Sequence, residues 1–249
     1  MIFLRMIFVK VICFMTQVLL YGSEKKVGLC IMATGRYVVF ASELIKSARE
    51  FFLKDCQVTY FVFTDGELSC EGEDIQTTYQ SRLGWPYDTM MRFEVYFNNK
   101  NLFDGYDYMF ALDADMLFVS DVGEEILGDL VGTIHPGYYN KPGTYETRRA
   151  STACVRKREA EHYFAGGFYG GKTKEFLQLL STTSANIRKD LHRDIIAVWH
   201  DESHLNRYFI DHPPTLKLDP SYCYPESWNL PFPKRLLALD KNHDELRKK

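Results

Sequence analysis

Two aspartates separated by one residue, Asp113 and Asp115, follow an apolar run at residues 108–112. On an extended segment, side chains two residues apart point to the same side, so both carboxylates face the same direction. Carboxylate oxygens are hard ligands that suit Mn²⁺, or Mg²⁺ in its place, when a phosphate supplies further oxygens. A metal held there would neutralise a nucleotide diphosphate as a leaving group. A solvated turn is the alternative, because such a pair is common by chance.

A second segment, WHDESH at residues 199–204, is dense in functional groups. His200 and His204 are four residues apart and could bind zinc, but the metalloprotease motif needs a glutamate where Asp201 stands. One buried and one exposed histidine is the simpler interpretation. Glu202 could instead serve as nucleophile or base at a glycosyl centre, where a cationic carbon must be stabilised and captured.

Glycines and basic residues add to this inventory. Two glycine pairs lie between aromatic residues in FAGGFYGG at 164–171; glycine lets a backbone approach a ligand closely, and a bulged or bent strand is the alternative. Lys241 and Arg247 lie in a polar tail, which is either solvated or able to fold over a diphosphate and expel water. Arg92 could add a charge-assisted contact to a phosphate or to a site carboxylate.

The composition is that of a globular protein. Hydrophobic residues make up 46% and charged residues 25% of 249 residues, which excludes disorder, collagen and coiled coil. The net charge of −3 offers no basic surface of the kind that nucleic acid requires, so we expect no nucleic-acid partner. Six scattered cysteines without a C-x-x-C pair predict mostly buried thiols rather than a disulfide framework.

The N-terminal segment differs from the rest. Residues 1–21 contain only two charges, Arg5 and Lys10, and are followed by Gly22-Ser23. This pattern resembles a signal peptide or a short anchor, although a full span needs about 20 apolar residues. A start assigned too early, with the chain opening near Glu24, is the alternative. We therefore expect membrane association through residues 1–21, or a cytoplasmic protein if the start is misassigned.

Apolar runs and helical spacing predict alternating strands and helices. The expected strands cover 27–34, 58–63 and 108–112, and the expected helices cover 37–52, 89–97, 172–181 and 190–199. Residues 71–87 are expected to form a loop, 132–158 show little periodicity, and the chain is irregular from Pro213. Strand, helix, strand in this order predicts a parallel α/β sheet. Ligands bind at the carboxyl ends of such strands, where Met32-Ala33-Thr34, Asp65 and Asp113-Ala114-Asp115 fall.

Six segments occur in a familiar order: YMFALDADMLF, GTIHPGYY, TYETRR, FAGGFYGG, AVWHDESHLNRYF and KNHDELR. Together they resemble glycosyltransferase family 6, which includes the histo-blood group A and B transferases and the α-1,3-galactosyltransferases. The resemblance runs from about residue 27 to residue 247. It implies a GT-A fold, a Rossmann-like nucleotide-sugar-binding domain with a mostly parallel central sheet and helices on both faces. That domain would cover residues 24–249 with a mobile tail at 240–249, after an apolar segment at 1–23.

The resemblance also implies an activity: Mn²⁺-dependent, retaining α-1,3 transfer of galactose or N-acetylgalactosamine (GalNAc) from a UDP-sugar to a β-galactoside, fucosylated or not. Glu202 matches the catalytic glutamate, and Asp113 and Asp115 match the metal ligands. Positions that match donor contacts are Met32, Ala33, Thr34, Tyr37, Arg92, Ala114, Ala165, Gly166, Gly167, His200, Asp201, Lys241 and Arg247. Positions that match acceptor contacts are His135, Thr144, Trp199 and Glu226.

Particular residues refine these expectations. Many bacterial members carry Asn-x-Asn and work without metal, so the two aspartates here favour metal dependence. The long stem of the animal enzymes is missing, which indicates a microbial or viral member acting in glycan or lipopolysaccharide biosynthesis. In this family the segment Ala165-Gly166-Gly167 lines the pocket around the C2 substituent of the donor sugar. Small residues there leave room for an acetamido group and predict UDP-GalNAc over UDP-Gal.

Two mechanisms and two rival classes stay open at this point. Glu202 either attacks the anomeric carbon to form a covalent glycosyl-enzyme or stabilises positive charge while the acceptor attacks from the leaving-group face. A non-catalytic protein that binds UDP-sugar or glycan on the same fold is one rival. A zinc hydrolase built on His200 and His204 is the other.

Overall fold

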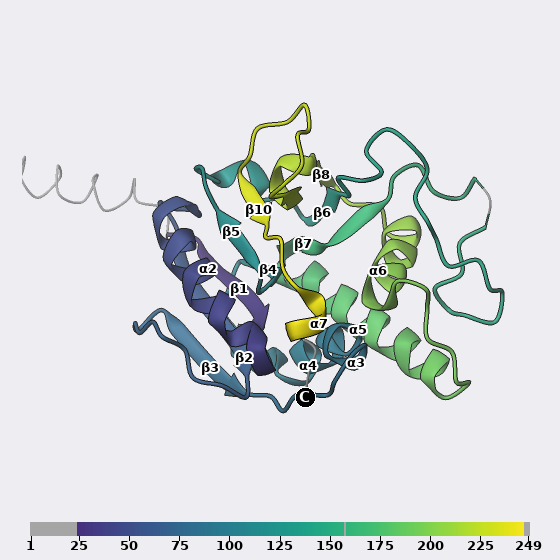
Figure 1. Cartoon of the computed structure of the whole chain (residues 1–249), viewed down its shortest axis with the longest axis horizontal. Helices are drawn as coiled ribbons and strands as arrows, with labels where there is room; N and C mark the ends of the chain where they lie inside the picture. Colours follow the sequence, from purple (N-terminus) through teal and green to yellow (C-terminus); the bar gives the residue numbers. More distant parts are fainter. Residues whose placement is uncertain (1–23, 157, 247–249) are drawn as a thin grey trace, which may run out of the picture.

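The computed structural model describes residues 24–156 and 158–246. Its centre is a seven-stranded sheet with the order β3-β2-β1-β4-β7-β6-β8 (Figure 1). The strands are β1 (Lys26–Met32), β2 (Gln57–Thr64), β3 (Ile75–Tyr79), β4 (Tyr108–Asp113), β6 (Leu130–Ile134), β7 (Phe164–Lys172) and β8 (Leu216–Leu218). Strand β7 pairs antiparallel with β4 and β6, and the other neighbouring pairs in this sheet are parallel. The predicted mostly parallel α/β sheet is therefore confirmed.

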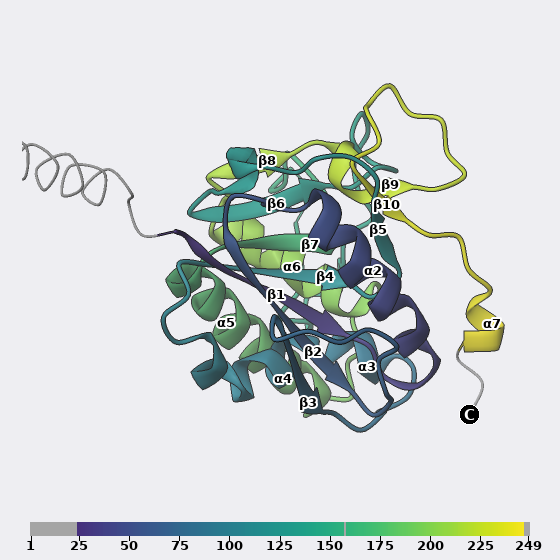
Figure 2. The same cartoon turned by 90° about the vertical axis from the view of Figure 1, so that its left-hand side faces the viewer.

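Helices cover both faces of the sheet (Figure 2). They are α2 (Val38–Phe51), α3 (Tyr87–Met90), α4 (Arg92–Asn98), α5 (Thr173–Leu191), α6 (His200–Asp211) and α7 (His243–Leu246). A smaller sheet has the order β5-β10-β9, from β5 (Met116–Phe118), β10 (Leu236–Ala238) and β9 (Tyr224–Pro225). In Figure 2 the chain after β10 runs past the carboxyl ends of the parallel strands to α7.

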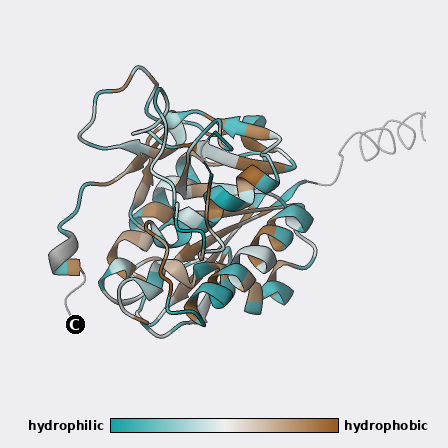
Figure 3. Ribbon diagram, turned by 90° about the vertical axis from the view of Figure 1, so that its right-hand side faces the viewer, coloured by the Kyte–Doolittle hydropathy of each residue, from teal (hydrophilic) through white to brown (hydrophobic). Residues whose placement is uncertain are grey.

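The central strands are apolar throughout because both of their faces are buried. Alternate residues of β1 serve opposite cores: Leu29 and Ile31 pack with the α2 side, and Cys30 packs with the side of α4, α5 and α6. Figure 3 shows hydrophobic colouring along the sheet and hydrophilic colouring on the outer helix surfaces. The expected strands at 27–34, 58–63 and 108–112 and the expected helix at 37–52 are confirmed to within a few residues.

Three expectations about local structure were wrong. The expected loop at 71–87 contains β3, an edge strand whose mixed exposure removes the apolar signal. The expected helix at 190–199 is instead a turn: α5 ends at Leu191, Asp194 takes a φ of 55°, and α6 begins only at His200. Short strands β8, β9 and β10 lie in the region expected to be irregular.

The glycine-rich segment at 164–171 is strand β7, and it carries a bulge. Gly132 of β6 pairs with Tyr169, whereas Ile134, only two residues on, pairs with Phe164. The extra β7 residues leave the regular ladder, which confirms the bulged-strand interpretation. The bulge brings the Gly166 backbone close to Glu202 of α6. The Gly166 N–H donates to Glu202 Oε2 at 2.8 Å.

The expected membrane location needs correction. Among residues 24–156 and 158–246, no helix has the length and apolar character that crossing a bilayer requires. The segment at 1–23, on which that expectation depended, lies outside the described residues. Of the five described cysteines all are free, and Cys30, Cys56 and Cys223 are buried, as predicted.

Candidate active site

A cavity of about 160 Å³ opens at the carboxyl ends of β1 and β4. These strands are parallel neighbours, so the residues that follow them meet at one edge of the sheet. The cavity is lined by Met32, Thr34, Tyr37, Arg82, Trp85, Asp88, Thr89, Arg92, Asp113, Ala114, Asp115 and Lys241. Eight of these residues were predicted as donor contacts or metal ligands, namely Met32, Thr34, Tyr37, Arg92, Asp113, Ala114, Asp115 and Lys241.

A second cavity adjoins the first and contains the proposed catalytic glutamate. Its lining is Trp85, Thr89, Arg92, Asp113, Gly166, Gly167, Trp199, His200, Asp201 and Glu202. Arg92 and Asp113 line both cavities. The D-x-D pair at the end of β4 and the carboxylates at the start of α6 therefore border one continuous cleft.

Arg92, the first residue of α4, links the two carboxylate groups. Its side chain is 7% exposed, and it lies 2.5 Å from Asp113 Oδ1 and 3.2 Å from Asp201 Oδ2. It also donates to the backbone carbonyl of Gly166 at 3.4 Å. Burial alone would lower the pKa of Arg92, but the two carboxylates outweigh burial and raise it. The guanidinium thus stays charged and fixes the geometry of the cleft.

Glu202 is held by both of its carboxylate oxygens. Tyr163 donates its hydroxyl to Oε1 at 2.8 Å, and the Gly166 N–H donates to Oε2 at 2.8 Å. Burial raises the pKa of Glu202 to about 7, against the lowering effect of these two hydrogen bonds. Burial also raises the pKa of Asp201 to about 6, with Arg92 acting in the opposite direction. Two carboxyl groups that titrate near neutrality in one cleft are typical of acid–base or nucleophilic sites.

The two aspartates of the D-x-D pair are each in contact with a cation of this chain. Asp113 pairs with Arg92, and the buried Asp115 forms an ion pair with Lys241. In the described part of the chain no group of three or more histidine, cysteine, aspartate or glutamate side chains could hold a metal. A divalent ion at this pair would therefore take its further oxygens from a bound diphosphate, and the hard donor set fits that role.

The histidines of the WHDESH segment point to different surroundings. His204 is buried with its Nε2 3.8 Å from Asp190 Oδ2, and burial lowers its pKa to about 4. His200 packs its ring against Trp85 with centroids 4.7 Å apart, at the wall of the cleft. Within the described residues they share no metal-binding group, so the structure gives the zinc interpretation no support.

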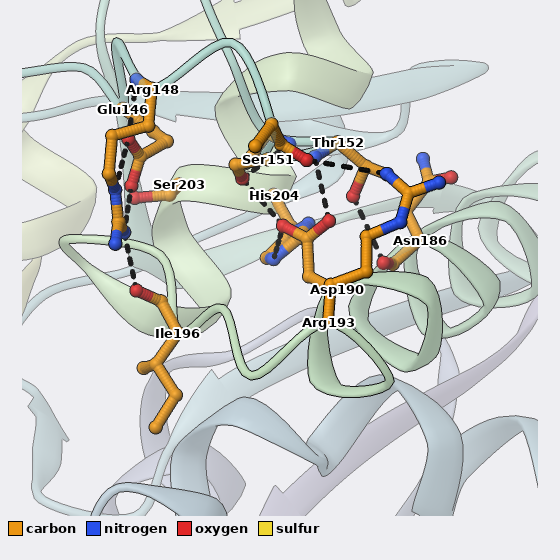
Figure 4. A network of polar contacts seen from close by, with 12 residues as sticks. Glu146, Arg148, Ser151, Thr152, Asn186, Asp190, Arg193, Ile196, Ser203 and His204 are labelled. Carbon is orange, nitrogen blue, oxygen red and sulfur yellow. Dashed lines mark hydrogen bonds and ion pairs between the residues drawn. The ribbon is translucent and has the colours of Figure 1, made fainter.

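A buried polar network sits behind this wall (Figure 4). Glu146, 2% exposed, accepts from the Val198 N–H at 3.0 Å and from Arg148 at 2.6 Å. Arg148 in turn donates to the Ile196 carbonyl at 2.5 Å. The hydrogen bond from the Arg148 side chain lowers the pKa of Glu146 to about 2. These bonds fasten the 196–198 turn and so place Trp199 at the cleft.

Of the four predicted acceptor positions, three lie on the Glu202 side. Trp199 lines the second cavity and is 46% exposed. His135 packs against Tyr163 with ring centroids 5.6 Å apart, and burial lowers its pKa to about 4. Thr144 shares a 2.9 Å hydrogen bond with Tyr138. Glu226 does not line either cavity, and its carboxylate accepts from the Asp240 N–H at 2.9 Å.

Other predicted positions fall outside the cleft lining. Ala33 and Ala165 are buried in the core, and Arg247 lies outside the described residues. Asp65, which also follows a strand, accepts from the Gly35 N–H at 2.6 Å and so braces the turn after β1. Five residues at the site were not predicted: Arg82, Trp85, Asp88, Thr89 and Tyr163. Of these, only Tyr163 has a signal in the sequence, because it directly precedes the glycine-rich segment.

Paired aspartates at one strand end and a partly buried glutamate across the cleft define an α/β protein with its ligand site at the carboxyl ends of the strands. Comparisons with known proteins identify the family. The model of glycosyltransferase family 6 matches residues 14–248, so this chain belongs to that family and is a glycosyltransferase. Its mixed α/β fold with a mostly parallel sheet is that of the GT-A type.

Named relatives share much of the sequence. The chain is similar to histo-blood group ABO system transferase 1 of Rattus norvegicus, at 35% identity over 89% of this chain and 68% of the relative. It is similar to globoside alpha-1,3-N-acetylgalactosaminyltransferase 1 of Homo sapiens, at 34% identity over 89% and 68%. A bacterial relative, O-antigen biosynthesis glycosyltransferase WbnI of Escherichia coli, is 27% identical over 88% of this chain and 96% of its own length.

Proposed function

We propose that this glycosyltransferase moves GalNAc, and galactose less well, from UDP to a β-galactoside with retention and α-1,3 linkage. One observation carries the proposal: Arg92 and Asp113 line both the D-x-D cavity and the Glu202 cavity. A donor whose diphosphate lay beside Asp113 and Asp115 would extend its sugar towards Glu202. The name of the human relative, globoside alpha-1,3-N-acetylgalactosaminyltransferase 1, supports the same linkage and sugar.

The residues of the cleft suggest how each part of a donor is held. Met32, Thr34 and Tyr37 line the first cavity and would contact the uridine, and Lys241 of the same lining would neutralise charge on the diphosphate. When bound, Mn²⁺ at Asp113 and Asp115 would stabilise the leaving diphosphate. Arg92 and Asp201 would orient the sugar, and neutral His135, which can donate from Nε2 because its Nδ1 accepts from Gly137, would meet an acceptor hydroxyl.

Glu202 would act at the anomeric carbon in one of two ways. As a nucleophile it forms a bond to that carbon while the bond to the diphosphate oxygen breaks, and the acceptor oxygen then displaces it. As an electrostatic stabiliser it faces the cationic carbon without bonding to it, while the bond to the diphosphate oxygen breaks and the acceptor oxygen bonds to that carbon on the same face. Both routes retain the configuration, and both need the carboxylate form of Glu202.

Metal dependence is tested by Asp115→Asn. We expect the substitution to lower Mn²⁺-supported transfer by about 100-fold or more, because a metal at a developing charge is worth several kcal/mol. EDTA should have a comparable effect on the unaltered enzyme. The measurement is the initial rate of UDP release with Mn²⁺, Mg²⁺ or EDTA, with Asp129→Asn, a change in an exposed ion pair, as the matched control. Full activity in EDTA would remove the metal role from both aspartates.

Donor choice is tested by Gly167→Ala. A Cβ at Gly167 would lie 3.0 Å from Cys223 Sγ, 3.4 Å from Met116 Sδ and 3.6 Å from Asp113 Oδ2, so it takes up space beside the cleft. We expect the ratio of kcat/KM for UDP-GalNAc over UDP-Gal to fall by about 10-fold or more, within the range of one small-group contact. Cys223→Ala added to Gly167→Ala relieves the tight contact and should restore part of the ratio. An unchanged ratio in Gly167→Ala would contradict the pocket assignment.

The activity as a whole is tested by UDP release from UDP-GalNAc and UDP-Gal, with and without a panel of β-galactosides that includes fucosylated ones. We expect release that depends on Mn²⁺ and rises with acceptor. No release from either donor by folded protein that still binds UDP would contradict the proposal.

A further inference from the structure

Tyr163 lies at the junction of the two halves of the site and is 1% exposed. It directly precedes β7, and its hydroxyl donates to Glu202 Oε1 at 2.8 Å. Because the Gly166 N–H holds the other oxygen, the carboxylate is fixed at two points. Tyr163 stands just before β7 and Gly166 lies near its start, so the irregular register of β7 with β6 sets how the two donors face Glu202.

The ring of Tyr163 belongs to the acceptor side of the cleft. Its centroid lies 5.6 Å from that of His135, 4.8 Å from that of Tyr138 and 5.0 Å from that of Tyr145. Each of these pairs is an edge-to-face contact, an arrangement that holds rings in defined orientations. These contacts hold the ring of Tyr163, so its phenol oxygen cannot move away from Glu202 without displacing the rings packed against it.

A second tyrosine in the same cluster shows that this contact is particular to Tyr163. Tyr145 has the same residue type and touches the same ring, but its hydroxyl donates to the His162 carbonyl at 2.9 Å. Removing that hydroxyl leaves both hydrogen bonds to Glu202 in place. The chain thus contains its own matched control.

We propose that Tyr163 is a positioning residue for the reaction: its hydroxyl fixes the Glu202 carboxylate towards the anomeric carbon and favours the ionised form of that carboxyl. The inference rests on the proposed role of Glu202. A hydrogen bond to an ionised acceptor stabilises it more than a neutral bond does. Without the hydroxyl, the partly buried Oε1 has one donor fewer, and the carboxylate is free to turn about the Gly166 N–H.

The first experiment compares Tyr163→Phe with Tyr145→Phe in steady-state transfer. We expect Tyr163→Phe to lower kcat by about 10- to 100-fold with the KM for donor changed by less than about threefold, since the loss falls on the reacting geometry. In the plot of kcat against pH, the acid limb of Tyr163→Phe should shift to higher pH by about one to two units, the equivalent of one charge-assisted hydrogen bond. Tyr145→Phe should match the unaltered enzyme in kcat, in the KM for donor and in the position of the acid limb.

The second experiment reads Glu202 directly and does not depend on catalysis. The carboxyl is titrated by NMR on protein with ¹³C-labelled glutamate, and Glu202→Gln assigns its signal. The other titratable groups that face it are Asp201, Asp113 and Cys223. We expect the pKa of Glu202 to be higher in Tyr163→Phe than in the unaltered enzyme and to be unchanged in Tyr145→Phe.

The two experiments separate the inference from the proposed function. Equal kcat and equal Glu202 titration in the two tyrosine variants would overturn the role of Tyr163. A Glu202 pKa that moves only in Tyr163→Phe, in a protein that releases no UDP from any donor, would support the contact and overturn the proposed function instead.

Discussion

Replacing Glu202 with glutamine is expected to lower the turnover of sugar transfer by at least about 1,000-fold, in the range of lost nucleophiles and charge stabilisers. The affinity for UDP should change little, because Glu202 lies in the second cavity and does not line the first. Glutamine keeps the shape of the side chain. Its amide oxygen can accept from the Gly166 N–H while the Tyr163 hydroxyl turns to accept from the amide nitrogen.

The measurement pairs single-turnover rates with UDP titration by calorimetry. Glu43→Gln is a suitable control, because Glu43 is exposed on α2 and forms only a short-range ion pair with Lys46. Near-normal turnover in Glu202→Gln would remove this residue from the mechanism. A loss of UDP affinity equal to the loss of turnover would show that the substitution damages the whole cleft.

Arg92→Met is expected to lower the free energy of unfolding by about 3–5 kcal/mol at neutral pH, the usual cost of breaking a buried ion pair by removing one partner. The change leaves the buried Asp201 and its neighbour Asp113 without their shared cation. Since Arg92 lowers the pKa of Asp201, its loss should raise that pKa further above about 6.

The sign of the pH dependence follows from that raised pKa. A carboxyl whose pKa is higher in the folded state binds more protons there than in the unfolded chain, so stability falls as pH rises from about 4 to the folded pKa. The loss in free energy of unfolding caused by Arg92→Met should therefore become smaller as the pH falls towards 4. Urea unfolding at several pH values measures it, with Lys54→Met as the control because its ion pair with Asp121 is exposed and worth about 0–1 kcal/mol. Equal losses in the two variants would contradict the account of Arg92.

Much of the donor half of the site could be predicted because it depends on local patterns. Residues 108–112 of β4 are an uninterrupted apolar run buried on both faces, Asp113 ends the strand, and Asp115 stands two residues further on. Strand order in a parallel sheet then places Met32 and Thr34 beside them. Glu202 was found because a dense polar segment is unusual in a chain of this composition.

The rest could not be predicted, because long-range contacts decide it. The turn at 192–199 has apolar residues at helical spacing, but Asp190 accepts from Ser151 and Thr152 and ties the end of α5 to a distant loop. The bulge in β7 depends on the register with β6. The role of Tyr163 depends on that bulge. In the sequence, an aromatic residue beside glycines indicates only a strand; the contact of Tyr163 with Glu202 is seen only in the fold.

The structure of the product is the most direct test of whether this enzyme forms a new α-1,3 linkage with retention. UDP-GalNAc, Mn²⁺ and a β-galactoside are incubated with the enzyme, and the purified product is examined by mass spectrometry and NMR. We predict one added N-acetylhexosamine with an α anomeric proton and its linkage at O3 of the galactose. A β anomeric product, or a linkage at another hydroxyl, would contradict the account, and free GalNAc with no glycosylated acceptor would contradict transfer itself.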